Sequence, residues 1–305
     1  MATTRLLQTS HGTNREAFTP LDWGRFIALS LIWGASFLFI AIGLDAFHPG
    51  VVTFLRVALG AAALTAIPGT RMVRIDRADY GSVALLAAIW VAIPFTLFPI
   101  AQQWIDSAVA GMLNGATPIF TALLATFLLR ALPGPLQLMG LAVGFVGILA
   151  IALPSAGSGS TEALGVGLVL AATTGYAVSL NLVPPLQQKY GSLSLMAWVL
   201  WLAVPMVAPF GVIGAFDSSF AWSSLLAVVA VGVLGTGLAF VLMGNLTGSV
   251  GATRASFITY LIPVVALVLG VVFRGEVVSP VAVAGVLLVI AGAVLASRRE
   301  LRKRR

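Results

Sequence analysis

The sequence contains no cysteine and only two histidines among its 305 residues. The absence of cysteine excludes a disulfide framework, a thiolate metal site and a cysteine nucleophile. Charged residues are also scarce, at 9% of the chain against about 25% in a soluble domain. So few charges cannot cover a water-soluble globule of this size. The composition therefore excludes an ordinary cytosolic enzyme, a nucleic-acid-binding module and a disordered chain.

Acidic side chains are missing from the interiors of the long apolar runs that make up most of the chain. All ten Asp and Glu residues lie at or beyond the ends of those runs, and no interior holds Asp, Glu, His or Lys. An intramembrane aspartyl protease needs two buried carboxylates, a rhomboid-type hydrolase needs Ser with His, and a zincin needs HExxH. We therefore expect no catalytic residue, no enzyme activity, no metal and no cofactor. A proton relay of buried carboxylates is missing as well.

What the chain does contain is apolar segments of membrane-spanning length. A helix needs about 20 residues to cross roughly 30 Å of hydrocarbon, and lipid leaves no alternative that satisfies such a backbone. The ten segments lie at 24–44, 50–68, 80–100, 107–129, 135–153, 163–183, 193–214, 221–244, 250–273 and 279–297. The polar start of the chain shows no apolar h-region with a cleavage site, so we expect no removable signal peptide. The pattern predicts an all-α polytopic membrane protein with ten transmembrane helices.

Basic residues are distributed unevenly over this pattern. Ten spans place both termini on one side, and that side then holds all of the 17 Lys and Arg residues except Arg56, Arg254 and Arg274. By the positive-inside rule this side is the cytoplasm. We therefore expect a multi-pass protein of the cell (inner) membrane, with reporter fusions at Ser158 and Thr70 reading outside and inside. The same bias accounts for the net charge of +7 without a nucleic-acid partner.

The second half of the chain repeats the punctuation of the first. A shift of 145 residues places Pro118 on Pro263 and Gly147 on Gly292, and a shift of 142 lays Trp33-Gly34 on Gly175-Tyr176. Each copy holds five spans, an odd number, so the second copy enters from the opposite side. The sequence thus predicts two inverted five-helix repeats, an arrangement found in many secondary transporters. The predicted divisions are a cytoplasmic segment 1–23, repeats 24–153 and 163–297, an external linker 154–162 and a basic cytoplasmic tail 298–305.

With this layout, the chain resembles the EamA branch of the drug/metabolite transporter superfamily. The resemblance rests on Trp33-Gly34, on the Pro49…Arg56 spacing, and on the stretch from Tyr260-Leu261-Ile262-Pro263 through Gly275-Glu276 to Gly292. The first half departs from it, because Arg130-Ala131 stands where the second half has Gly275-Glu276. The resemblance implies a ten-helix transporter that moves small metabolites or amphipathic compounds, often outward.

Two matched prolines indicate where a substrate site lies. Pro118 falls near the middle of its span, and a proline inside a helix deprives the carbonyl four residues earlier of its hydrogen bond. That residue is Asn114 in the first repeat and Thr259, four before Pro263, in the second. Paired interruptions in two halves favour a binding site, while kinks that only shape packing are the alternative.

Aromatic and basic side chains add further candidates. Trp33, Trp90, Tyr176 and Tyr260 lie within spans, where they either line a cavity or fill the core, and for Trp90 core filling is favoured. Arg56 either steers an anionic group or extends to the nearer interface. Two further prolines, Pro94 and Pro205, are candidate hinges or mere bends.

These observations predict a secondary transporter of small organic metabolites, such as amino acids or amphipathic compounds, that works by alternating access. Its expected partners are the small-molecule substrate and the lipid bilayer. Alternatives are an importer, a carrier of phosphorylated or lipid-linked substrates read by Arg56, an intramembrane enzyme, or a non-transporting assembly subunit. We expect Glu276 to pair with Arg274 or to cap the turn into the last span, and flux to persist without a pH gradient.

Overall fold

The computed structural model describes residues 18–67, 69–129, 134–156 and 159–297, and most of these residues are helical with no strand among them. The first cytoplasmic segment, most of the basic tail, Arg130-Ala131 and the reporter position Ser158 lie wholly or largely outside the described residues. The predicted divisions of the chain stay predictions.

The described part of the chain forms ten spans, as the sequence predicted. Six are single helices: α1 (Pro20–Leu44), α2 (Pro49–Ala66), α7 (Pro135–Ala156), α8 (Ser160–Leu182), α10 (Ser192–Ala215) and α15 (Pro280–Ser297). The third span joins η1 (Arg77–Asp79), α3 (Tyr80–Leu86), η2 (Ala87–Ala92) and α4 (Ile93–Ala101), and the fourth joins α5 (Ser107–Asn114) and α6 (Thr117–Leu129). The eighth joins α11 (Trp222–Gly232), η3 (Val233–Leu238) and α12 (Ala239–Val250), and the ninth joins α13 (Ala252–Ala255) and α14 (Ile258–Arg274). A short helix, α9 (Pro184–Tyr190), lies between α8 and α10.

Local sequence sets where these helices begin and end. The first span starts at Pro20 rather than at the predicted residue 24, because Thr19 and Asp22 form a capping box there. The eighth span runs on to Val250 rather than ending at residue 244, and Gly251 terminates it with a φ of 86°. Among the described residues, eight spans are long and apolar enough to cross a membrane by length and composition, and Ile258–Arg274 and Pro280–Ala296 are shorter apolar helices.

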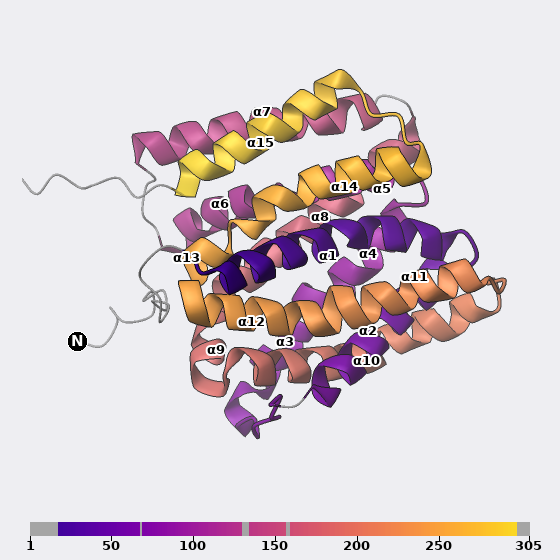
Figure 1. Ribbon diagram of the computed structural model, residues 1–305, viewed down its shortest axis with the longest axis vertical. Helices are drawn as coiled ribbons and strands as arrows, with labels where there is room; N and C mark the ends of the chain where they lie inside the picture. The colour runs from indigo at the N-terminus through magenta and orange to yellow at the C-terminus, as the bar shows by residue number, and fades with distance from the viewer. Residues whose placement is uncertain (1–17, 68, 130–133, 157–158, 298–305) are drawn as a thin grey trace, which may run out of the picture.

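The spans pack in matched pairs that relate the two halves of the chain. In Figure 1, α7 and α15 form the upper edge of the bundle and α2 and α10 the lower edge, so each edge pairs a helix with its repeat partner. Further contacts are matched too: α1 packs on α14 and α8 on α6, while α2 packs on η3 and α10 on η2. The prediction of an all-α protein built from two inverted five-helix repeats is confirmed.

Glycines let the edge helices α7 and α15 approach backbone to backbone. A Cβ at Gly147 would lie 2.7 Å from the carbonyl oxygen of Gly285, and one at Gly140 would lie 2.7 Å from that of Gly292. Small residues at such positions permit close helix packing in membranes. The glycine spacing of the fifth span, with Gly140 and Gly144 four apart, is therefore a packing feature.

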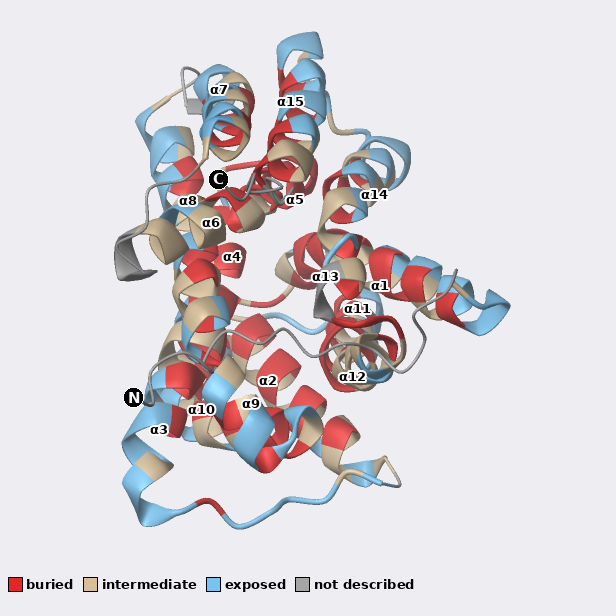
Figure 2. Cartoon of the chain, turned by 90° about the vertical axis from the view of Figure 1, so that its left-hand side faces the viewer, coloured by how far each residue is buried: buried red, intermediate tan, exposed pale blue. Residues whose placement is uncertain are grey.

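The surface of the bundle is apolar. Figure 2 shows exposed residues on the outward faces of α7, α14 and α15, with buried residues turned toward the neighbouring helices. Large apolar side chains such as Leu153, Phe273 and Leu287 are each more than half exposed. Such a surface suits hydrocarbon rather than water. The chain is therefore a multi-pass membrane protein.

Candidate functional site

The third and eighth spans each contain a π-helical segment at matching places in the two repeats. In η2 the N–H of Ile93 bonds to the carbonyl of Ala88, and in η3 the N–H of Ala239 bonds to that of Leu234, so both bonds reach back five residues. π-Segments inside α-helices are rare and are frequent at functional sites. Each half of the chain thus places one such segment in the interior of the bundle.

Small residues allow η3 to sit close against α2. A Cβ at Gly237 would meet the side chain of Ala63 at 2.6 Å, and one at Gly232 would lie 3.2 Å from the carbonyl oxygen of Arg56. Thr236 lies between them, fully buried, and its hydroxyl donates to the carbonyl of Val231 at 3.1 Å. The glycine-rich sequence therefore brings the Thr236 hydroxyl to the face of α2 that carries Arg56.

Helix α8 packs closely against η2, in the same way that α2 packs against η3. A Cβ at Gly175 of α8 would lie 2.8 Å from the carbonyl oxygen of Ile89, and Pro94 follows the segment directly. Gly175 is the repeat partner of Trp33, and the indole N–H of Trp33 donates to the carbonyl of Gly235 in η3 at 3.1 Å. Each π-segment thus meets the matching helix of the other repeat.

Four of the predicted side chains meet around these segments. The rings of Trp33 and Trp90 both pack edge-on against Phe240, with centroids 6.3 and 6.2 Å away. Tyr176 stacks on Phe98 at 5.9 Å. We call Trp33, Arg56, Trp90, Phe95, Phe98, Tyr176, Thr236 and Phe240 the central cluster.

Arg56 supplies the charge of the central cluster. Its side chain is buried, with the residue only 6% exposed, and it does not extend to the outer interface as one prediction had it. The Nε–H donates to Thr236 Oγ1 at 3.3 Å, and Cζ lies 3.7 Å from the centroid of the Phe95 ring. Tyr176 lies near enough to interact with it electrostatically. No carboxylate in the described part of the chain forms an ion pair with Arg56.

The polar groups of Thr259 and Tyr260 bond within the ninth span and to the tenth span, and the fourth span is interrupted just after Asn114. The fourth span breaks at Gly115 and Ala116, where the Thr117 hydroxyl donates to the carbonyl of Asn114 at 2.8 Å, while Asn114 Oδ1 is buried without a partner. The Thr259 hydroxyl donates to Ser256 O at 2.7 Å, and the Tyr260 hydroxyl to Ala293 O at 3.2 Å.

The prolines behave differently in the two repeats. Pro118 is the second residue of α6, just after the break in the fourth span, whereas Pro263 lies inside α14 and the ninth span breaks earlier, at 256–257. Pro263 packs against Gly115, where a Cβ would lie 2.6 Å from its Cγ. Pro205 lies within α10, which continues through it.

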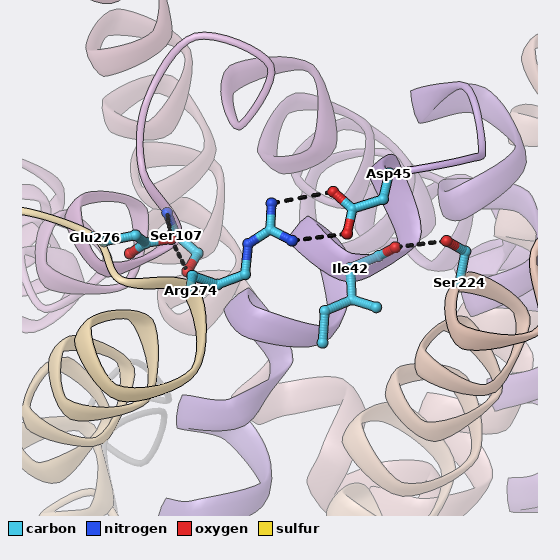
Figure 3. A network of polar contacts seen from close by, with 6 residues as sticks. All are labelled: Ile42, Asp45, Ser107, Ser224, Arg274 and Glu276. Carbon is cyan, nitrogen blue, oxygen red and sulfur yellow. Dashed lines mark hydrogen bonds and ion pairs between the residues drawn. The ribbon is translucent and has the colours of Figure 1, made fainter.

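One end of the bundle is held by a polar network, drawn in Figure 3. We call this end, which carries Asp45, Ser107 and Arg274, the outer end. Arg274 donates to both carboxylate oxygens of Asp45, at 2.7 and 3.0 Å, and so joins the ends of α14 and α1. The Ser224 hydroxyl donates to Ile42 O at 2.7 Å and ties α11 to α1.

Glu276 caps a helix of the other repeat. Its carboxylate accepts hydrogen bonds from the N–H of Ser107 at 3.0 Å, the hydroxyl of Ser107 at 2.6 Å and the N–H of Ala108 at 2.8 Å. These groups form the N-terminus of α5, where a negative charge is favoured. The prediction that Glu276 pairs with Arg274 or caps the turn into the last span is wrong, because α5 offers free N–H groups and Arg274 is taken by Asp45.

Asp106 lies beside this cap. Burial and then the nearby Glu276 carboxylate raise the pKa of Asp106, and Arg274 opposes them. Asp106 precedes α5 but makes no side-chain capping bond, since Glu276 occupies the N-terminus instead. The outer end thus carries one carboxylate whose charged form is disfavoured.

The opposite, inner end has a different tie. Lys189, at the end of α9, pairs with Asp76 at 2.6 Å and with Asp79 at 2.7 Å, and the Tyr190 hydroxyl donates to Asp79. This links the segment before the third span with the one before the seventh. It involves neither the fourth nor the ninth span.

Several residues of the central cluster escape prediction from sequence: Phe95, Phe98, Thr236 and Phe240. The phenylalanines are indistinguishable from core residues in the sequence. Thr236 carries a signal in the sequence, since it is the polar residue of the glycine-rich run Gly232 to Gly237. A polar residue inside a glycine-rich span segment is the pattern to look for.

Comparison with known proteins gives matches over nearly the whole chain. The EamA-like transporter family matches residues 25–153 and 163–298, one match for each repeat. The probable terminal-alkyne amino-acid exporter of Streptantibioticus cattleyicolor is 29% identical over 90% of this chain and 92% of its own length. The probable amino-acid metabolite efflux pump of Salmonella typhimurium is 25% identical over 88% and 92%. A solved crystal structure with a TM-score of 0.57 and 18% identity, covering 90% of this chain and 96% of its own, shares the fold.

Proposed function

Because the chain belongs to the EamA-like transporter family and is a membrane transporter of small metabolites, we propose that it exports amino acids or closely related amphipathic compounds across the cell membrane. Similarity to two amino-acid-type exporters supports this substrate class. The placement of Lys and Arg supports both termini lying in the cytoplasm. In that orientation the outer end of the bundle faces away from the cytoplasm.

The observation that carries the proposal is the central cluster between two repeat-related π-segments. Trp33, Trp90, Tyr176 and Phe240 are partly exposed although spans of both halves surround them. Partial exposure at an interior meeting point is what an accessible cavity requires. Aromatic walls with a few polar groups suit a small amphipathic solute, and transporter sites form where interrupted spans of two repeats meet.

The contacts at the two ends support loading from the cytoplasm. The outer halves of three spans, α4, α5 and α11, all pack against α1, and the polar network of Figure 3 ties that end together. The inner halves have different neighbours: α6 packs on α8 and α15, while α12 packs on α1 and α13. A carrier closed outside and divided inside accepts substrate from the cytoplasm, as an exporter must before alternating access.

The test is efflux from proteoliposomes loaded with labelled aromatic and aliphatic amino acids. We expect efflux faster than from protein-free vesicles, and a loss of most of it in Trp33→Ala, which removes the bond to Gly235. Leu226→Ala, on the exposed face of α11, serves as the control and keeps wild-type flux. Efflux equal to that of protein-free vesicles for every compound would overturn the proposal.

A further inference from the structure

We infer that Arg56 binds the carboxylate of the transported compound, so that the substrates are carboxylic acids recognised without need of their amino group. The inference deepens the proposed function and rests on it. It follows from three features of the described residues: the free donors of Arg56, its fixed position, and the acids missing around it.

The first feature is the set of hydrogen-bond donors that Arg56 leaves free. A guanidinium has five N–H donors, and in this structure only the Nε–H is used, toward Thr236. The two Nη atoms bond to no described residue. They are not among the fully buried, unpartnered atoms, which belong to Thr70, Gln102 and Asn114, so each retains some exposed surface. Their four N–H groups form the edge that takes a carboxylate in a bidentate manner.

The second feature is that this edge is held in place. Phe95 covers one face of the guanidinium, with Cζ 3.7 Å from the ring centroid, and the Thr236 hydroxyl fixes Nε. Thr236 is itself held by the close approach of α2 to η3. This approach is so close that a Cβ added at Gly60 would lie 2.6 Å from the Thr236 side chain. Burying an unpaired charge costs free energy, and a bound anion that pairs with the guanidinium would offset that cost.

The third feature is the lack of a counter-charge. The described span interiors contain no Asp or Glu near Arg56, and at the outer end Asp45 is engaged with Arg274 and Glu276 with the start of α5. An incoming ammonium group therefore has no carboxylate partner in the cluster. The apolar part of the substrate has Trp33, Trp90 and Phe240 to contact. One guanidinium balances a single negative charge, which favours a carboxylate over a doubly charged phosphate.

Three phenylalanine derivatives separate the contributions of the two charged groups. N-acetylphenylalanine keeps only the carboxylate, phenylalanine keeps both groups, and phenylalanine methyl ester keeps only the amine. Binding to the purified wild-type protein is measured by the quenching of tryptophan fluorescence, to which Trp33 and Trp90 contribute. We expect both acids to bind and the ester to bind at least tenfold more weakly, as the loss of a charge-assisted bond predicts.

The variants Arg56→Gln and Arg56→Lys test the residue itself. Arg56→Gln should lose acid binding by about tenfold or more and leave ester binding unchanged, and Arg56→Lys should lose less. Arg25→Gln, at a partly exposed arginine near the inner end of α1, is the matched control and should bind like wild type.

Three results would overturn the inference: an ester that binds wild type as well as the acids, acid binding untouched in Arg56→Gln, or phenyl phosphate preferred to N-acetylphenylalanine. The wild-type comparison decides even if Arg56→Gln fails to fold. Acids that bind without being transported would overturn the proposed function alone. Transport with equal use of acid and ester would overturn this inference alone.

Discussion

At the scale of single residues, Asp106 is a carboxyl group whose charged form its surroundings disfavour. Its pKa is raised by burial and by Glu276, so the ionised form destabilises the folded state at neutral pH. That penalty disappears as the pH falls through the raised pKa. Asp106→Asn should therefore raise the Tm in detergent by roughly 1–2 °C at neutral pH and by less at acid pH.

A thermal-shift series against pH checks this, with Asp217→Asn in the exposed outer loop as the control. A gain that grows toward acid pH would contradict the assigned sign.

Glu276 makes a second prediction at this scale. Glu276→Gln still accepts hydrogen bonds but loses the charge at the start of α5, at a cost of about 1 kcal/mol. Glu276→Ala leaves the Ser107 and Ala108 N–H groups unpaired and should cost about 2–3 kcal/mol. Because the carboxylate serves as a cap, efflux should be reduced in Glu276→Gln but should persist without a pH gradient. Efflux that depends on a pH gradient in wild type and is lost in Glu276→Gln would instead assign the residue to proton coupling.

The sequence could indicate the role of a single residue only where its contacts lie close to it along the chain. The proline rule correctly pointed to the Asn114 carbonyl, but it could not show that the Thr117 hydroxyl, three residues on, bonds to that carbonyl. Arg56 was identified by its rarity inside a span. Its burial depends on η3, which lies 180 residues later in the chain, so only the tertiary structure reveals it.

At the scale of elements, the π-segment η3 sets the rotation of α12 relative to α11. Deleting Leu234, a partly exposed residue, should convert η3 to α-helix and turn one side of the span against the other by about 100°. The Phe240 ring would then lose its contacts with the rings of Trp33 and Trp90. We expect membrane insertion to remain and efflux to fall to background.

Size-exclusion profiles and proteoliposome flux measure the two effects, and deletion of Asp217 in the exposed loop is the matched control. Full efflux after the Leu234 deletion would show that the π-segment has no functional role.

The elements themselves were predictable to different degrees. Apolar runs of spanning length and prolines such as Pro49 and Pro280 locate helices from sequence alone. A π-segment differs from an α-helix only in that its backbone hydrogen bonds reach back five residues instead of four. The residues of η2 are ordinary for a membrane span. Its place could therefore not be predicted, although Pro94 stood beside it.

At the scale of the whole molecule, the lack of cysteine makes topology directly measurable. Single cysteines placed at Met72 and Asp217 lie at opposite ends of the bundle. With the inner end in the cytoplasm, a membrane-impermeant thiol reagent added to intact cells should label Asp217→Cys and spare Met72→Cys. Lysed cells should label both. Labelling of both in intact cells, or the reverse pattern, would contradict the orientation.

A negative charge on the substrate would also give export a driving force, because the membrane potential acts on it. If the transported compound is a monoanion, an inside-negative potential of 100 mV favours its exit by about 2.3 kcal/mol, roughly a fiftyfold gradient. No buried carboxylate is then required. Efflux of N-acetylphenylalanine should accelerate when a potassium diffusion potential makes the vesicle interior negative, and slow when the potential is reversed. Equal rates under both potentials would exclude this driving force.

The ion pair between Arg274 and Asp45 makes the protein sensitive to the salt concentration around it. Its side chains are 34% and 49% exposed, so dissolved ions reach it, and in the proposed orientation these ions come from outside the cell. The Debye length falls from about 8 Å at physiological ionic strength to about 3 Å in molar salt, which weakens such a pair. Salinity on the outer face alone would thus loosen the closure there and leave the buried Arg56 unaffected. The external salt concentration becomes a control on how readily the carrier opens outward.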